Sequence, residues 1–129
     1  MWKKKEEKDN KIEIVLGQIF IRIKHDLEEL NKISNMPGFE EQNQESIDII
    51  TNVMQNALRV ISKTKSIRND TWWEKNIINN LDKAIKDKDI STKKDKVDLI
   101  IVNFLRKYPE LIIIFKKKRL LDESFFKKI

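Results

Sequence analysis

The residues of this 129-residue chain best suited to chemistry are basic, and the chemistry is anion binding. Four are consecutive, Lys116-Lys117-Lys118-Arg119, and Arg106, Lys107, Lys127 and Lys128 extend the group to eight. Such side chains neutralise phosphates and release counterions, which gives affinity without reading of base sequence. Cations near a helix C-terminus also interact favourably with the helix dipole, so a purely structural interpretation stays open. The pattern predicts a surface for an acidic partner, either nucleic acid or an acidic protein.

The charge of the chain is concentrated around these residues. Residues 93–129 contain eleven Lys and Arg against five Asp and Glu, whereas residues 1–92 contain sixteen of each kind. The formal net charge of +6 therefore belongs entirely to the last third of the sequence. A basic segment of this kind indicates an electrostatic role in binding rather than a particular fold.

A pair of tryptophans, Trp72 and Trp73, is the second feature with functional potential. Consecutive helix residues point about 100° apart, so both rings cannot enter the same core. We expect Trp73 to be buried and Trp72 to lie at a helix edge. Trp72 is then either a structural staple at the start of a helix or an anchor for a partner, because tryptophan is enriched at interface hot spots.

Residues for catalysis or metal binding are few. His25 is the only histidine, and a helical metal site of the Glu-x-x-His type needs a second copy that this chain lacks. The absence of cysteine excludes disulfides and thiol catalysis. The two glycines, Gly17 and Gly38, are isolated and form no phosphate-binding loop. We therefore expect a protein that is not an enzyme and has no cofactor or metal.

Hydrophobic periodicity predicts an all-α fold, a compact bundle of four to five helices. Pro109 disfavours helix at the preceding residue but suits a first helical position, so we expect a break between the last two long helices. Thr71-x-x-Glu74 is a capping box that marks the third helix, and Ser91 or Thr92 can cap the fourth. The predicted helices cover about residues 10–33, 44–63, 72–88, 92–107 and 109–121, followed by a short Phe125-Phe126 tail.

One segment allows another interpretation. Residues 11–24 alternate apolar and polar side chains like two strands, and Gly17 could open a hairpin turn. A lone hairpin is marginally stable, and the helical pattern continues without interruption to Ile33. We therefore expect a helix here.

Residues 10–129 are expected to form a single helical domain, preceded by a flexible charged segment, residues 1–9. Acidic residues follow the first lysines before any apolar run, which argues against a signal peptide. The chain has no uncharged apolar window of about 18 residues, so no transmembrane segment is expected. We predict a cytoplasmic protein, and the abundance of Lys, Ile and Asn suggests an AT-rich genome.

These observations favour a small binding or regulatory module whose basic C-terminal third docks on an acidic surface. One alternative is an inhibitor or immunity-type protein that binds a protein partner through an apolar groove with Trp72 as anchor. In outline the chain resembles bacteriocin immunity proteins, which are small basic helical bundles, although no motif matches theirs residue by residue. Another alternative is a self-assembling structural protein, a possible homo-oligomer through the very apolar segment 97–121.

Overall fold

The computed structural model describes residues 11–34 and 36–129, and this part of the chain is helical without strands. The predicted all-α class is therefore confirmed, and the first nine residues, expected to be a flexible charged segment, lie outside the described part. The elements are α2 (Lys11–Ile33), α3 (Glu40–Lys63), α4 (Lys65–Arg68), α5 (Thr71–Trp73), the π-helical segment η1 (Glu74–Ile78), α6 (Asn79–Lys86), α7 (Ile90–Lys107), α8 (Glu110–Lys117) and α9 (Glu123–Phe126).

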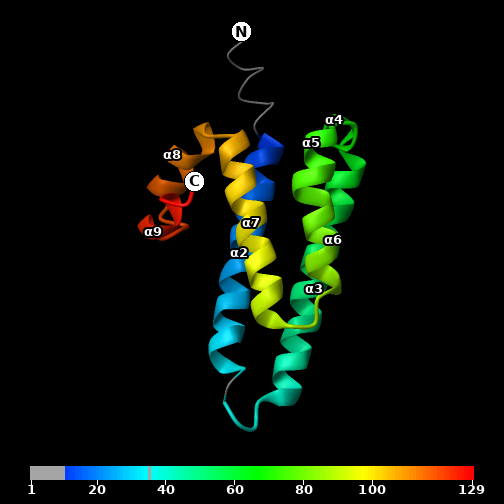
Figure 1. Cartoon of the computed structure of the whole chain (residues 1–129), viewed down its shortest axis with the longest axis vertical. Helices are drawn as coiled ribbons and strands as arrows, with labels where there is room; N and C mark the ends of the chain where they lie inside the picture. The colour runs from blue at the N-terminus through cyan, green and yellow to red at the C-terminus, as the bar shows by residue number, and fades with distance from the viewer. Residues whose placement is uncertain (1–10, 35) are drawn as a thin grey trace.

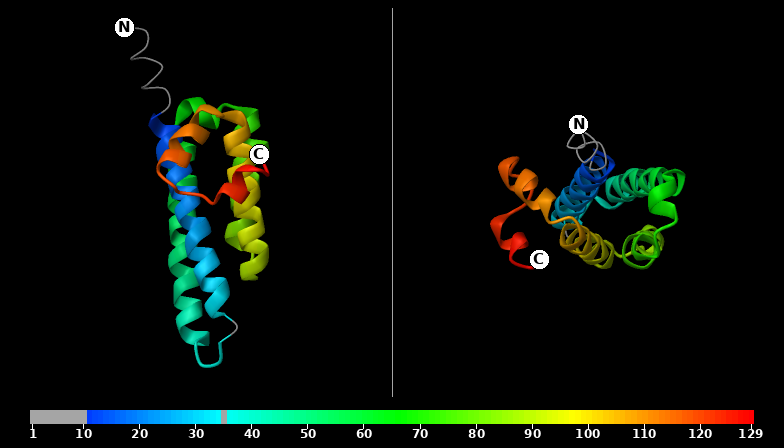
Figure 2. Two further views of the ribbon diagram at one scale, coloured as in Figure 1. Left: turned by 90° about the vertical axis from the view of Figure 1, so that its left-hand side faces the viewer. Right: turned by 90° about the horizontal axis from the view of Figure 1, so that it is seen from above.

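Four long helical rods form the body of the molecule (Figure 1). Helix α2 packs against α3 and α7, and α6 packs against the same two helices, which closes a four-membered ring. The view from above in Figure 2 shows α8 and α9 outside this ring, beside α2 and α7. The segments are more numerous than the four or five predicted, because the third predicted helix is divided into α5, η1 and α6 and short helices occupy two predicted breaks.

An aromatic cluster joins three of the rods. The ring of Phe104 on α7 meets the rings of Phe20 and Trp73 edge to face, each at a centroid distance of 5.7 Å. Tyr108 extends the cluster, and its hydroxyl accepts a hydrogen bond from the Trp73 indole at 2.9 Å. Phe104 and Trp73 are both buried, and the burial of Trp73 was predicted from the sequence. Edge-to-face pairs of this kind stabilise a core beyond the area that they bury.

Helix starts differ from the sequence prediction in which residue caps them. Asp70, not Thr71, precedes the third rod, and its carboxylate accepts the Trp72 amide proton at 2.9 Å. Asp89, not Ser91 or Thr92, precedes α7, and it accepts both the amide and the hydroxyl of Thr92. An ionised carboxylate is favoured over a hydroxyl here because it also interacts with the positive helix N-terminus.

The break at Pro109 lies where it was predicted, but helix α8 is shorter than expected. Tyr108 leaves the helical region with φ −121° and ψ 68°, and Pro109 is the residue before the first turn of α8. Helix α8 ends at Lys117 instead of Leu121. Helix α3, in contrast, begins at Glu40, four residues before the predicted start.

Most of the apolar segment 97–121 belongs to the core of its own chain. Its buried side chains are Val97, Ile100, Ile101, Val102, Phe104, Leu105, Leu111, Phe115 and Leu121. The segment was expected to be either the bundle centre or an oligomer interface, and these residues place most of it in the core. An oligomer interface through its exposed side chains stays a prediction. Only Leu99 and Ile113 are large apolar side chains of this segment that stay exposed. No helix in residues 11–34 and 36–129 has the length and hydropathy needed to span a membrane.

Gly17 allows the last helices to approach α2. It lies buried in the middle of α2, so the hairpin alternative for residues 11–24 is wrong. A Cβ atom at this position would lie 2.6 Å from Cζ of Phe115 on α8 and 3.1 Å from a ring carbon of Phe104. Any larger residue would force the two rings away from α2.

This contact predicts the effect of Gly17→Ala. In an unobstructed helix the change would stabilise by about 1 kcal/mol, because alanine has the higher helix propensity. Here the clash should dominate and lower the free energy of unfolding by about 1–3 kcal/mol, measured by urea denaturation. A more stable Gly17→Ala protein would show that the approach of Phe115 is not tight.

Lys93 is a fully buried cation that closes the end of α6. Its Nζ donates hydrogen bonds to the carbonyl oxygens of Ala84 at 2.5 Å and Ile85 at 3.3 Å. Burial lowers the pKa of Lys93 below its ordinary value of 10.5; Asp87 opposes this shift and Lys96 adds to it. The amine therefore satisfies helix-terminal carbonyls that would otherwise be buried without a donor.

The lowered pKa predicts a pH effect with a definite sign. At neutral pH the folded protein holds a charged amine in an unfavourable environment. This cost disappears as the pH rises from the lowered pKa to 10.5, where the unfolded chain also loses the proton. The free energy of unfolding of the wild type minus that of Lys93→Met should therefore increase between neutral pH and about pH 10.5. A constant or falling difference in parallel urea titrations would contradict this assignment.

Candidate nucleic-acid interface

Residues 110–129, here called the C-terminal unit, carry six of the eight predicted cations and dock on one side of the bundle (Figure 2). Phe115 is buried against Gly17 of α2. His25 Nε2 donates a hydrogen bond to the carbonyl of Leu120 at 2.7 Å, and Arg106 donates to the carbonyl of Lys128 at 2.9 Å. Helix α2 therefore holds the middle of the unit, and α7 holds its C-terminal end.

A nearly buried ion-pair network lies beneath α9. Lys24 on α2 pairs with Glu28 at 2.8 Å and with Asp98 on α7 at 3.0 Å. Burial lowers the pKa of Lys24, but the hydrogen bonds and charges of Glu28 and Asp98 outweigh it, and the net shift is upward. The ammonium also lies 4.8 Å from the centre of the Phe125 ring, a cation–π contact that helps position α9.

The basic run, Lys116–Arg119, begins in the last turn of α8 and ends in a left-handed turn. Arg119 has φ +52°, and the amides of Arg119 and Leu120 donate to the carbonyls of Lys116 and Phe115. This pair of bonds is the Schellman arrangement, in which glycine is the usual left-handed residue. All four cations of the run are exposed, and none has an acidic side chain within ion-pair distance among the described residues.

Two cations of the C-terminal unit rest on its aromatic rings. Lys116 lies 5.2 Å from the centre of the Phe126 ring, and Lys128 lies 5.3 Å from that of Phe125. The aliphatic stems cover apolar surface while the charges remain in water. The α9 rings therefore bring the basic run and the end of the chain onto one unit.

Lys107 belongs to a different environment from the basic run. Its Nζ pairs with Asp70 at 2.7 Å and lies 4.2 Å from the centre of the Trp72 ring. The hydrogen bond from Lys107 lowers the pKa of Asp70, and the Trp72 amide adds to that shift. Its charge is thus already compensated inside the molecule, unlike those of the basic run.

A shallow hollow of about 280 Å³ connects Trp72 with the predicted cations Arg106 and Lys107. Asn76 and Asn103 complete its lining. Trp72 is half-buried at the helix edge, as predicted. The hollow offers one aromatic ring, two amides and two cations, and no aliphatic residue lines it.

Sequence reasoning missed Lys24, Asn76 and Asn103, and it considered His25 only as a possible metal ligand. No local signal marks them, because each acquires its role from a residue far away in the chain. His25 is half-exposed and docks the C-terminal unit. Within residues 11–34 and 36–129, no three His, Asp or Glu side chains are grouped to hold a metal ion.

Comparison with known proteins adds no functional information. No family model, no curated protein and no solved structure matches this chain.

The left-handed turn predicts that arginine at position 119 costs stability. Arg119→Gly removes the steric cost of a Cβ in this conformation and should raise the free energy of unfolding by about 1 kcal/mol. Chemical denaturation measures the gain, and Lys118→Gly serves as the matched control because Lys118 has φ −81°. The control should lose stability; a loss in Arg119→Gly as well would contradict the turn described here.

Proposed function

We propose that this protein is a non-enzymatic nucleic-acid-binding module whose C-terminal unit contacts the phosphate backbone. The observation that carries the proposal is the basic run: four consecutive exposed cations without acidic partners in the described chain, next to a turn where glycine would be more stable. Keeping an arginine at a position that favours glycine fits a residue retained for its charge. The long helices then serve as the scaffold that presents this charge.

The arrangement of the cations favours phosphates over base edges. Helix α8 has eight residues and follows the α7 helix directly through Tyr108 and Pro109. It therefore lacks the turn that sets a recognition helix into the major groove in a helix-turn-helix protein. Side chains at the end of a short helix and in a turn can reach the phosphates of a duplex or of a single strand. Such contacts carry no sequence information.

The Trp72 hollow supports this proposal over the inhibitor alternative. An apolar docking groove at Trp72 would need aliphatic lining, but the hollow is formed with Asn76, Asn103, Arg106 and Lys107. Lys107 is already paired with Asp70, but the two amides and Arg106 beside a tryptophan ring suit a phosphate, a sugar or a base better than an apolar side chain. Action in the cytoplasm is part of the same proposal.

The proposal predicts a salt-dependent affinity that the basic run dominates. Each phosphate contact contributes about −0.9 to the slope of log affinity against log salt on duplex DNA, so four contacts give roughly −3.6. The variant with Lys116, Lys117, Lys118 and Arg119 changed to Gln keeps the aliphatic stems and should lose most of this slope. Fluorescence anisotropy with a labelled duplex at several salt concentrations measures both quantities.

The matched control changes Lys63, Lys65, Lys75 and Arg68 to Gln. These residues are three exposed lysines and one exposed arginine on α3, α4 and η1, and they remove the same charge from elsewhere. The control should retain most of the affinity. An equal loss of affinity in the two variants would show that binding depends on the net charge of the protein and not on the basic run.

Absence of salt-sensitive binding by the wild type to both duplex and single strand would overturn the proposal, and an acidic protein would then be the expected ligand of the basic run. Trp72→Ala tests the inhibitor alternative directly. If a protein partner is lost in Trp72→Ala but kept in the Gln variant, Trp72 is the anchor and the basic run is not.

A further inference from the structure

The far end of the molecule is a projecting pair of helices, here called the tip (residues 26–50). Helices α2 and α3 extend beyond the turn between α6 and α7, and the connection between them lies at the extreme end (Figures 1 and 2). Residues 44–48 of α3 still lie beside the α6–α7 turn, and only the helix ends beyond that turn have no third helix next to them. Met36, Phe39 and Ile49 are exposed apolar side chains of the tip.

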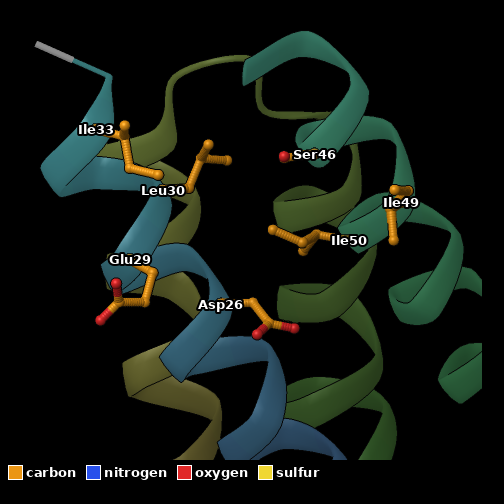
Figure 3. A pocket seen from close by; sticks show the side chains of 7 residues that line it. All are labelled: Asp26, Glu29, Leu30, Ile33, Ser46, Ile49 and Ile50. Atoms are coloured by element: carbon orange, nitrogen blue, oxygen red, sulfur yellow. The ribbon is translucent and has the colours of Figure 1, made fainter. Parts of the chain in front are cut away.

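A pocket of about 220 Å³ opens between the two helices of the tip. Leu30 from α2 and Ile50 from α3 face each other across it (Figure 3). Ile33 and Ile49 continue the apolar lining, and Ile49 is 64% exposed. An exposed apolar surface around a pocket is typical of an interaction site.

Acidic residues surround this apolar surface. Residues 26–50 contain seven Asp and Glu and one lysine, Lys32. Asp26 and Glu29 line the pocket itself, and Glu45 and Asp48 are exposed on α3. The partner that fits this surface presents an apolar side chain with positive charges next to it, since like charges would repel.

The C-terminal unit of the same chain presents such a surface. Ile113 on α8 is 64% exposed. Lys116 and Lys117 follow it by three and four residues, so they lie one turn further along the same side of the helix. An exposed isoleucine beside two exposed lysines complements the acidic tip in both apolar character and charge.

We propose that the tip of one copy binds α8 of a second copy, with Ile113 in the pocket between Leu30 and Ile50 and with Lys116 and Lys117 facing the acidic residues. The two surfaces lie on different parts of the molecule, so the contact is heterologous. A pair formed in this way keeps one free tip on one copy and one free α8 on the other, so association continues into open chains or rings.

The size and composition of these surfaces determine the behaviour expected. One short helix in one pocket makes a small interface, which corresponds to weak, concentration-dependent association. The charges at the edge make it sensitive to salt. Sedimentation velocity of the wild type should therefore show assemblies that grow with protein concentration and disappear in high salt.

Two variants at exposed positions separate the two halves of the contact. Ile49→Lys places a cation in the tip pocket, and Ile113→Glu places an anion on α8. Each variant should weaken self-association by about tenfold or more. It removes one apolar contact and at the same time introduces a charge that repels the like charges of the partner surface. A mixture of the two variants should form one-to-one pairs that grow no further, since only one intact tip and one intact α8 remain per pair.

Val60→Lys on α3 and Leu99→Glu on α7 are the matched controls, because both residues are exposed apolar side chains outside these surfaces. They should assemble like the wild type. A wild type that stays monomeric at all concentrations, or variants that fail to pair when mixed, would overturn the proposal. A wild type that forms dimers but no larger assemblies would also overturn the proposal, because it would indicate a symmetric dimer.

This inference goes beyond the proposed nucleic-acid binding, and the two can fail separately. Ile49→Lys should lose self-association and keep the affinity for duplex DNA and its salt slope. In the two proposals nucleic acid and a second copy compete for Lys116 and Lys117. An excess of duplex DNA should therefore shift the assemblies toward monomer.

Discussion

The close approach of two aromatic rings to Gly17 is the contact on which the arrangement of this protein depends. Phe104 from α7 and Phe115 from α8 occupy the space that a side chain on α2 would need. Phe104 also connects α2 with the third rod through its edge-to-face contacts with Phe20 and Trp73. The body and the C-terminal unit therefore share one packed centre, and a change at Gly17 affects both.

The cations are presented by this packing and not by a separate flexible tail. Phe115 anchors α8, His25 holds the carbonyl of Leu120, and the Lys24 network supports Phe125. The basic run lies between these anchors, at a turn that fixes its backbone. A charged segment with a fixed backbone loses little backbone freedom on binding, which favours its use as a binding surface.

The molecule has a long acidic, partly apolar tip and a basic C-terminal unit with an exposed isoleucine. This polarity explains why two proposals that use different ligands meet at α8. In both proposals the ligand, a polyanion or the acidic tip of a second copy, is attracted to Lys116 and Lys117. The two proposals together predict that nucleic-acid binding and assembly are linked, since occupation of α8 by one ligand would exclude the other.

The sequence alone determined the helical class, the break at Pro109, the burial of Trp73 and the concentration of charge in the last third. Each follows from local periodicity, backbone restriction or composition, which need no knowledge of distant residues.

Only the tertiary structure decided which cations remain uncompensated and which residues support them. Lys107 forms an ion pair with Asp70, Lys24 forms one with Asp98, and His25 donates a hydrogen bond to the carbonyl of Leu120. These partners are separated by 37, 74 and 95 positions in the sequence and come together only through packing of the helices. The helix cap is Asp70 and not the predicted Thr71, because the carboxylate of Asp70 accepts hydrogen bonds from both the Trp72 amide and the distant Lys107.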